Sequence, residues 1–162
     1  MKIVIVGAGE VGRYVAKMLS NENHDITIMD ESEDRLQDLD TNYDIMSRVG
    51  SPTSITDLQM CGVRNCDLFI AVYPSESVNT TACIIASKLG ARKTVARIDN
   101  YEYLLPKNKE MLKNLGIDKL IYPEVLAATE IVQSLKRSWI REYRTFSNEA
   151  LVLVCVKVRE NA

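Results

Sequence analysis

Three glycines near the amino terminus and one aspartate after them have the types and spacing of a nucleotide-binding site. Gly7, Gly9 and Gly12 follow an apolar run with the spacing G-x-G-x-x-G, and Asp30 closes the next apolar run. The first glycine of such a loop makes a tight turn, the second lets a pyrophosphate approach the backbone, and the third lets helix and strand pack closely. The pattern predicts a dinucleotide site that includes the whole loop: Gly7, Ala8, Gly9, Glu10, Val11 and Gly12.

Asp30 is expected at the tip of the second strand, where a carboxylate can accept hydrogen bonds from a ribose diol. The same carboxylate would repel a 2′-phosphate, so its position favours NAD over NADP. A glycine pattern alone is weak evidence, but here a strand precedes it and a helix and an acid follow it. The alternative interpretation is a tight strand-to-helix turn that binds no nucleotide.

A strand, a helix and a second strand are needed to hold these residues in place. Residues 3–6 read IVIV, a short run that is wholly apolar, as expected of a strand buried on both faces. A helix that begins at the glycine loop would direct its free N–H groups and the positive end of its dipole at the phosphates. Residues 26–29 form the second apolar run.

Apolar strands and amphipathic helices alternate over the rest of the first 122 residues. Further strands are expected at 43–49, 67–73, 93–98 and 119–121, with helical segments between them. This alternation is typical of an α/β protein with right-handed crossovers. We therefore predict a three-layer Rossmann fold over residues 1–122. It is a doubly wound parallel six-stranded sheet of order 3-2-1-4-5-6, followed by a C-terminal helix and an extra strand.

The carboxyl edge of such a sheet binds ligands at the switch point between strands 1 and 4. Arg97, near the end of the fifth strand, could pair with a phosphate there, or it could form an ordinary ion pair with Asp99 or Glu76. The residues that we expect to complete the site lie after strands 2 to 5. They are Asp30, Glu31, Gly50, Ser51, Tyr73, Pro74 and Arg97.

The segment after the sixth strand is predicted to be a linker helix over residues 123–144, with a basic end at Arg141 and Arg144. Apolar residues recur between Val125 and Trp139 at heptad-like spacing. The helix could dock on its own sheet or cross to a partner subunit, and we favour the partner. Residues 151–158 form a valine-rich β run with no strand nearby to pair with. The run either joins another subunit's sheet or opens a further, truncated domain over residues 145–162, and we favour the second.

Composition argues against several other classes of protein. The net charge of −2 gives no general basic character for nucleic acid, and no apolar run approaches the length of a membrane span. The N-terminus lacks a signal-peptide pattern, so we expect a cytoplasmic location. His24 is the only histidine and the four cysteines lack zinc-ligand spacing, so we expect no metal site and reduced thiols. No catalytic pattern accompanies the glycine loop, which favours a nucleotide sensor over an enzyme.

Three stretches of the sequence resemble the TrkA-type regulatory subunits of bacterial potassium uptake, which carry the RCK, or KTN, nucleotide-binding domain. The stretches are IVIVGAGEVGRYVAKMLSNENHDITIMD, VGSPTSITDLQMCGVRNCDLFIAVYPSESVNTTACIIASKLG and TVARIDN. The resemblance covers roughly residues 1–136. The chain departs from the family at Tyr73 and Pro74, because the family usually has threonine or a small polar residue after the Ala-Val of strand 4.

The resemblance implies a domain that binds NAD(H), or in relatives ATP or ADP, through Gly7 to Val11, Asp30, Tyr73, Pro74 and Arg97. It implies a homodimer or higher homo-oligomer, peripheral on the inner face of the cell membrane. There it would gate a membrane-embedded potassium transporter subunit. It also implies that residues 145–162 begin the smaller C-terminal RCK domain. The alternative function is the cofactor-binding half of an NAD-dependent dehydrogenase whose catalytic domain is truncated.

Overall fold

The computed structural model describes the chain except for residues 38, 40–42, 137–139, 147–150 and 157–162. The chain divides into two compact units. Unit 1 comprises Met1–Pro123 and unit 2 comprises Glu124–Ala162. Each unit is described by itself below.

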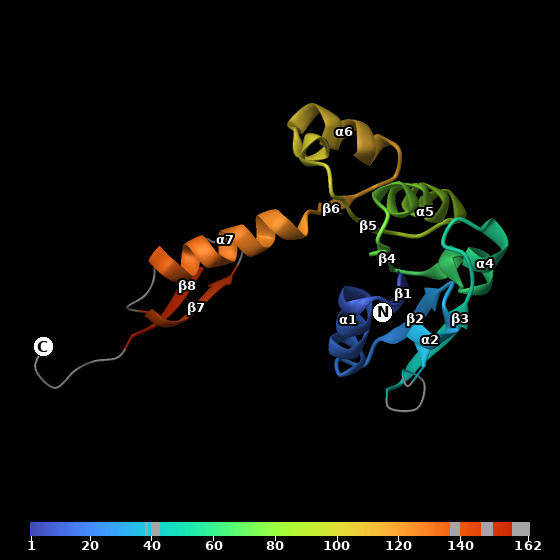
Figure 1. Ribbon diagram of the computed structural model, residues 1–162, viewed down its shortest axis with the longest axis horizontal. Coiled ribbons are helices and arrows are strands. Elements are labelled where there is room, and N and C mark those ends of the chain that lie inside the picture. The colour runs from blue at the N-terminus through green and yellow to red at the C-terminus, as the bar shows by residue number, and fades with distance from the viewer. Residues whose placement is uncertain (38, 40–42, 137–139, 147–150, 157–162) are drawn as a thin grey trace, which may run out of the picture. The chain divides into compact units, whose positions relative to one another are not determined.

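Unit 1 is built on one sheet of six parallel strands (Figure 1). The strands run in the order β3-β2-β1-β4-β5-β6, which confirms the predicted doubly wound topology. Their bounds are β1 (Lys2–Val6), β2 (Asp25–Asp30), β3 (Ile45–Val49), β4 (Leu68–Ala71), β5 (Thr94–Arg97) and β6 (Lys119–Ile121). The order places β1 and β4 side by side at the switch point, where the glycine loop was expected.

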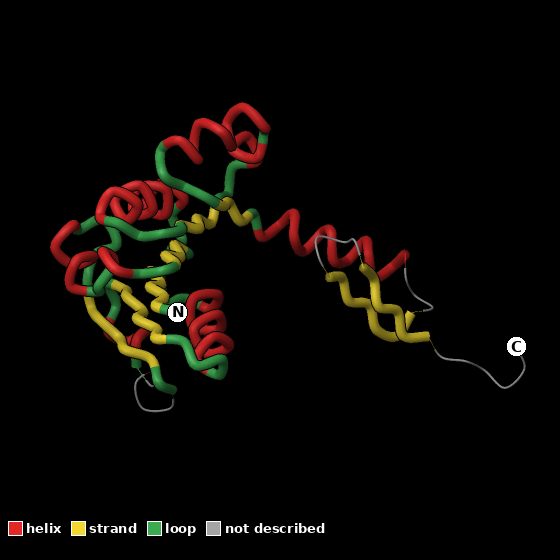
Figure 2. Tube along the Cα trace, turned by 180° about the vertical axis from the view of Figure 1, so that it is seen from behind, coloured by secondary structure: helices red, strands yellow, loops and turns green. Residues whose placement is uncertain are grey.

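Helices cover both faces of this sheet, so unit 1 has the three predicted layers (Figures 1 and 2). Side chains alternate between the two faces of a strand, so Ile3 and Ile5 enter one core while Val4 and Val6 enter the other. One core includes residues of α1 (Glu10–Ser20) and α2 (Glu33–Leu36). The other includes residues of α4 (Ile55–Met60), the 3-10 helix η1 (Val63–Asn65), α5 (Glu76–Leu89) and α6 (Pro106–Asn114), and the 3-10 helix η2 (Tyr101–Leu104) precedes α6.

The helix that leaves β6 is shorter than predicted. We expected a linker helix over residues 123–144, whereas α7 spans Pro123–Lys136 and Arg141 and Arg144 lie in strand β7 (Ile140–Phe146). Isoleucine, tyrosine, threonine and phenylalanine in β7 favour a pleated strand over a helix. The predicted end of the apolar row at Trp139 lies outside the described residues.

Strand β8 (Leu151–Val156) has a local partner, so the prediction that this run has none is wrong. It pairs antiparallel with β7, and Leu151 lies opposite Phe146 while Val156 lies opposite Ile140. The two strands form a separate two-stranded sheet (Figure 2). The backbone groups along one edge of β8 are therefore satisfied within unit 2.

Within the described residues, no helix has both the length and the apolar character that crossing a membrane requires.

Candidate functional site

Two glycines of the loop are required by the fold itself. Gly7 follows β1 with φ +100°, a conformation that glycine adopts without strain, and a Cβ there would lie 2.8 Å from the backbone nitrogen of Tyr73. A Cβ on Gly12 would overlap the carbonyl oxygen of Gly7. These two glycines let α1 pack tightly against the ends of β1 and β4.

Gly9 differs from its two neighbours because the fold leaves room for a side chain there. Its backbone is extended, with φ −71° and ψ −174°, and a Cβ would meet no heavy atom within 4 Å. Helix α1 begins at the next residue, Glu10, so the N–H groups of its first turn have no acceptor within the helix. Internal packing therefore gives no reason for glycine at this position, whereas close approach of a ligand to the backbone would.

Asp30 holds the glycine loop in place. One carboxylate oxygen accepts the Ala8 N–H at 2.8 Å, and the other accepts the Ser32 N–H at 2.9 Å. The Arg35 guanidinium lies 3.6 Å from the carboxylate, and the Asp30 side chain is only 1% exposed. The carboxylate thus ties the end of β2 to the loop after β1. Its expected contact with a ribose diol stays a prediction.

The loop after β3 lies next to Asp30, as predicted for a shared edge. The Gly50 N–H donates to the Asp30 carbonyl oxygen at 3.0 Å, and the Ser51 N–H donates to the Asp57 carboxylate at 2.9 Å. Asp57 in turn donates its N–H to the Ser54 hydroxyl at the start of α4. Sequence reasoning placed Gly50 and Ser51 in the site but did not assign Asp57 a role there. Its position three residues after a helix-capping serine was the available signal.

Asn79 of α5 fastens together the ends of β4 and β5. Its side-chain oxygen accepts the Tyr73 N–H at 2.7 Å, and its amide nitrogen donates to the carbonyls of Tyr73 and Arg97 at 2.9 and 3.0 Å. The residue is 1% exposed. The site prediction omitted Asn79, although a polar residue on the apolar face of a helix was a signal for it.

Arg97 forms the ion pair that we considered as an alternative to a phosphate contact. Its Nη2 lies 3.2 Å from an Asp99 carboxylate oxygen, whereas Glu76 instead accepts the N–H groups of Asp99 and Asn100. The Nε of Arg97 is buried and finds no hydrogen-bond partner among the described residues. Arg97 also lines a hollow of about 230 Å³ with Val11 at the start of α1. A phosphate contact of Arg97 stays a prediction.

Tyr73 and Glu31 meet over the carboxyl edge of the sheet. The Tyr73 hydroxyl donates to a Glu31 carboxylate oxygen at 2.9 Å. Burial raises the pKa of the Tyr73 hydroxyl, and the hydrogen bond with Glu31 and its charge raise it further. Pro74 is exposed just before Ser75, the N-cap residue of α5, and Glu10 is exposed at the start of α1. All the predicted positions thus lie at one edge of the sheet, in the last residues of its strands, in the loops that follow them or in the first turn of α1.

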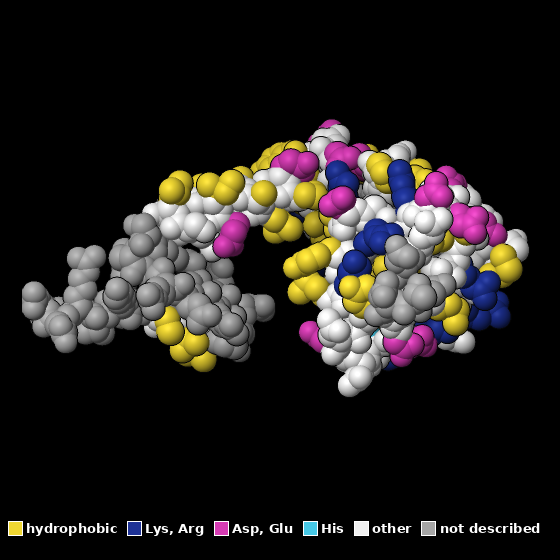
Figure 3. Space-filling view, turned by 60° about the horizontal axis from the view of Figure 1, so that its bottom comes forward, with side chains coloured by type: hydrophobic (Ala, Val, Ile, Leu, Met, Phe, Trp, Pro, Cys, Tyr) yellow, Lys and Arg dark blue, Asp and Glu magenta, His cyan; other side chains and the backbone are white. Residues whose placement is uncertain are grey.

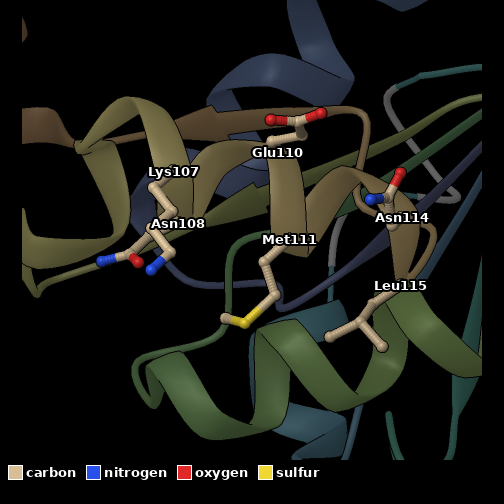
Figure 4. A pocket seen from close by; sticks show the side chains of 6 residues that line it. All are labelled: Lys107, Asn108, Glu110, Met111, Asn114 and Leu115. Atoms are coloured by element: carbon tan, nitrogen blue, oxygen red, sulfur yellow. The ribbon is translucent and has the colours of Figure 1, made fainter.

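The remaining features of the described residues are another hollow, the absence of a group of metal ligands and the free cysteines. A hollow of about 450 Å³ runs along α6, where Met111 and Leu115 point to one side and Glu110 to the other (Figure 4). No group of three or more potential metal ligands is present among the described residues. The four cysteines are free, and burial raises the pKa of Cys61 and Cys66 to about 11 and that of Cys83 to about 12.

Comparison with known sequences identifies relatives of the chain. A family model described as the TrkA-N domain matches residues 3–123. The Trk system potassium uptake protein TrkA of Haemophilus influenzae is 38% identical over 159 residues, which cover 97% of this chain and 35% of that protein. The chain therefore spans about a third of the length of this curated relative.

Two solved structures share the fold. The TrkA-N domain of the inner membrane protein YbaL from Escherichia coli has a TM-score of 0.71 at 16% identity, covering 83% of this chain and 96% of that chain. The GsuK channel bound to NAD has a TM-score of 0.61 at 22% identity, covering 74% of this chain and 21% of that chain. At these identities the likeness concerns the fold alone.

Proposed function

Because the chain belongs to the TrkA-N domain family, we propose that it is the nucleotide-sensing part of a regulatory subunit of a potassium uptake system. The proposed ligand is NAD(H), with ATP or ADP as alternatives that share its adenosine diphosphate half. Binding would bias a conformational equilibrium that gates a membrane-embedded transporter subunit from the cytoplasmic face. Its effect is limited by the difference in affinity of the ligand for the two conformations.

The open space at Gly9 is the observation that carries this proposal. Gly7 and Gly12 would be glycine in any tightly packed turn of this shape, whereas Gly9 has room for a side chain. A pyrophosphate that lies against the backbone at the start of α1 would use that room. The fold of the NAD-bound GsuK channel is compatible with such a ligand.

The described residues at this edge favour sensing over catalysis. A dehydrogenase needs a group that transfers a proton beside the nicotinamide. His24, the only histidine of the sequence, directly precedes β2 and so lies at the amino edge, opposite the glycine loop. The groups described at the carboxyl edge instead hold the loops together, as Asp30 and Asn79 do. We therefore propose a regulatory role without catalysis.

Helix α7 supports the proposal of a homo-oligomer. Large apolar side chains are exposed along it, and Figure 3 shows hydrophobic side chains on the surface of the helix. They are Val125, Leu126, Ile131, Val132 and Leu135. Exposed apolar surface of this kind marks interaction sites. We propose that α7 contacts a second copy of the chain. We also propose that a C-terminal RCK domain begins with β7 and not, as predicted, at residue 145, which lies within that strand.

Calorimetric titration of wild type and Gly9→Ala with NAD, NADH, ATP and ADP tests the nucleotide site. The added methyl group should weaken binding at least tenfold, because it occupies the space that the pyrophosphate needs. It should change the free energy of unfolding by no more than about 1 kcal/mol. His24→Ala, at the opposite edge, serves as the control and should bind like wild type. The proposal fails if wild type binds none of the four, or if Gly9→Ala binds equally well.

A further inference from the structure

We propose that Arg13 is a positioning residue of the nucleotide site: it holds helix α2 in the place from which Arg35 and Asp30 set the glycine loop. Arg13 directly follows Gly12, the last glycine of the loop, and acts on the loop through these other residues. The inference rests on the proposed function and deepens it, because it adds to the site a residue that sequence reasoning did not single out.

Helix α2 is too short to be stable by itself. It comprises the four residues Glu33–Leu36, whereas isolated helices in water need about 12–15 residues even in favourable sequences. Leu36 enters the core, and the rest of the helix lies on the surface. The position of α2 therefore depends on the contacts at its two ends.

Arg13 holds the C-terminal end of α2. Its Nη1 donates to the carbonyl oxygen of Arg35 and, at 3.2 Å, to that of Gln37, the C-cap residue. The last carbonyls of a helix lack donors within the helix and form the negative end of its dipole, so a guanidinium suits both properties. Since Arg13 lies in the first turn of α1, the contact joins α2 to the helix that begins at the glycine loop.

The other end of α2 is joined to the loop through Asp30. One carboxylate oxygen accepts the Ser32 N–H just before α2, and the other accepts the Ala8 N–H of the loop. The Arg35 guanidinium reaches back from α2 to the same carboxylate, at 3.6 Å. Arg35 thus meets Asp30 with its side chain and Arg13 with its carbonyl. A shift of α2 would draw a guanidinium away from a carboxylate that is 1% exposed, which is costly for a buried charge.

A loosened α2 would weaken ligand binding without removing any ligand contact. Asp30 would hold the Ala8 N–H less firmly, and the glycine loop would adopt its binding arrangement for a smaller fraction of the time. The apparent affinity of a ligand falls in proportion to the fraction of the protein that is competent to bind it. Arg13 is therefore expected to keep that fraction high.

The first test compares the affinities of wild type and Arg13→Met for NAD, NADH, ATP and ADP by calorimetry. Methionine keeps a long side chain but removes the donors, so binding should weaken about tenfold. Arg13→Lys keeps a charged donor and should bind within about threefold of wild type. Arg92→Met is the matched control, because it removes an exposed guanidinium that pairs with Asp67 just before β4, and it should bind like wild type.

A double-mutant cycle separates positioning from direct contact with the ligand. Arg13→Met and Arg35→Met together should weaken binding about as much as either alone, because both arginines act on the same carboxylate. A double variant that shows the product of the two single effects would overturn the inference. So would an unaltered affinity of Arg13→Met, even with a lowered urea midpoint, because Arg13 would then serve stability alone.

Hydrogen exchange of the Ala8 amide, followed by nuclear magnetic resonance, tests the same link without a ligand. Its protection should fall at least about tenfold in Arg13→Met, while the Asp67 amide, bonded to the Lys2 carbonyl at 2.8 Å, should keep its protection. Unchanged protection of Ala8 would overturn the inference. If wild type binds none of the four nucleotides, the proposed function fails, whereas the exchange of Ala8 still decides whether Arg13 positions the loop.

Discussion

The two units of the chain differ in how far they bury their apolar side chains. Unit 1 buries its apolar side chains in two cores, one on each face of the sheet, and ties the loops of its carboxyl edge with buried polar side chains. In unit 2 the described apolar side chains are largely exposed, with Leu135 73% and Leu151 63% accessible. The contrast indicates that contacts within the chain determine unit 1, whereas unit 2 presents a surface that suits a partner.

Size explains part of this contrast. A sheet of two strands is marginally stable on its own in water, and three or more strands or a packed helix are usually needed. The six strands of unit 1 exceed that requirement, whereas the described part of unit 2 consists of two strands, β7 and β8, and helix α7. We therefore expect unit 1 to keep its fold when contacts of unit 2 are removed.

The largest effect on unit 1 is expected from Gly12→Ala. The new Cβ would overlap the Gly7 carbonyl, and neither backbone can yield without separating α1 from β1. We expect a loss of more than about 4 kcal/mol in the free energy of unfolding, measured by urea denaturation followed by circular dichroism. Gly9→Ala is the matched control, because it adds the same methyl group to open space. Equal midpoints for the two variants would contradict the packing that we describe.

The reactivity of the cysteine thiols should distinguish the two units without any mutation. Cys61, Cys66 and Cys83 are buried in unit 1 with pKa values of about 11 to 12, whereas Cys155 is exposed on β8. At pH 8 a thiol of pKa 11 is about one part in a thousand thiolate, and the thiolate is the reactive form. A maleimide reagent followed by mass spectrometry should modify Cys155 first and the others only on unfolding. Equal rates for all four in native protein would contradict the burial of the unit 1 core.

Asn79→Ala should destabilise unit 1 by about 1–3 kcal/mol, because it leaves backbone groups of Tyr73 and Arg97 without their partner. Thermal and urea unfolding measure the change. Nucleotide affinity should fall too, since the variant loosens the ends of β4 and β5 on one side of the switch-point crevice. Asn114→Ala, on the exposed side of α6, is the control and should stay within about 0.5 kcal/mol of wild type. A neutral Asn79→Ala would show that the three hydrogen bonds do not hold this edge.

The smallest effect on unit 1 is expected from charging α7. Val132→Asp combined with Leu135→Asp should convert the proposed dimer to a monomer in sedimentation, because carboxylates cannot be buried cheaply in an apolar interface. The unfolding of unit 1 should change by no more than about 0.5 kcal/mol. Glu130→Lys changes the charge of the helix by the same amount and should leave the mass unchanged. An unaltered mass for the double variant would reject α7 as the interface.

The sheet of unit 1 was predictable because each element carried a local signal. Residues 3–6 were wholly apolar, and Val4, Ile5 and Val6 are fully buried in β1. Gly7 and Gly12 marked the loop after β1. A side chain on Gly7 would meet Tyr73, just after the neighbouring strand β4, and a side chain on Gly12 would meet Gly7 in the same loop. The strand order followed from the alternation of strands and helices and the handedness of crossovers.

The hairpin of unit 2 was not predictable in the same way. Apolar residues recur at helical spacing only as far as Trp139, and the predicted helix was extended to residue 144 on the strength of its basic end. In the structure Ile140–Phe146 instead pairs with β8 as a strand. The propensity of a short segment for a strand depends on its cross-strand neighbours. The local sequence does not determine which strand will pair with such a segment.

The sequence by itself determined the parallel sheet, the glycine loop and the edge at which the site residues gather. Those features depend on the periodicity of apolar residues and on the backbone freedom of glycine, which are local properties. Only the tertiary structure decided that Asp30 is enclosed, that Asn79 joins two strand ends, and that Tyr73 reaches Glu31, 42 residues earlier in the chain. Contacts between side chains far apart in sequence depend on how the strands lie side by side, so they appear only once the sheet has formed.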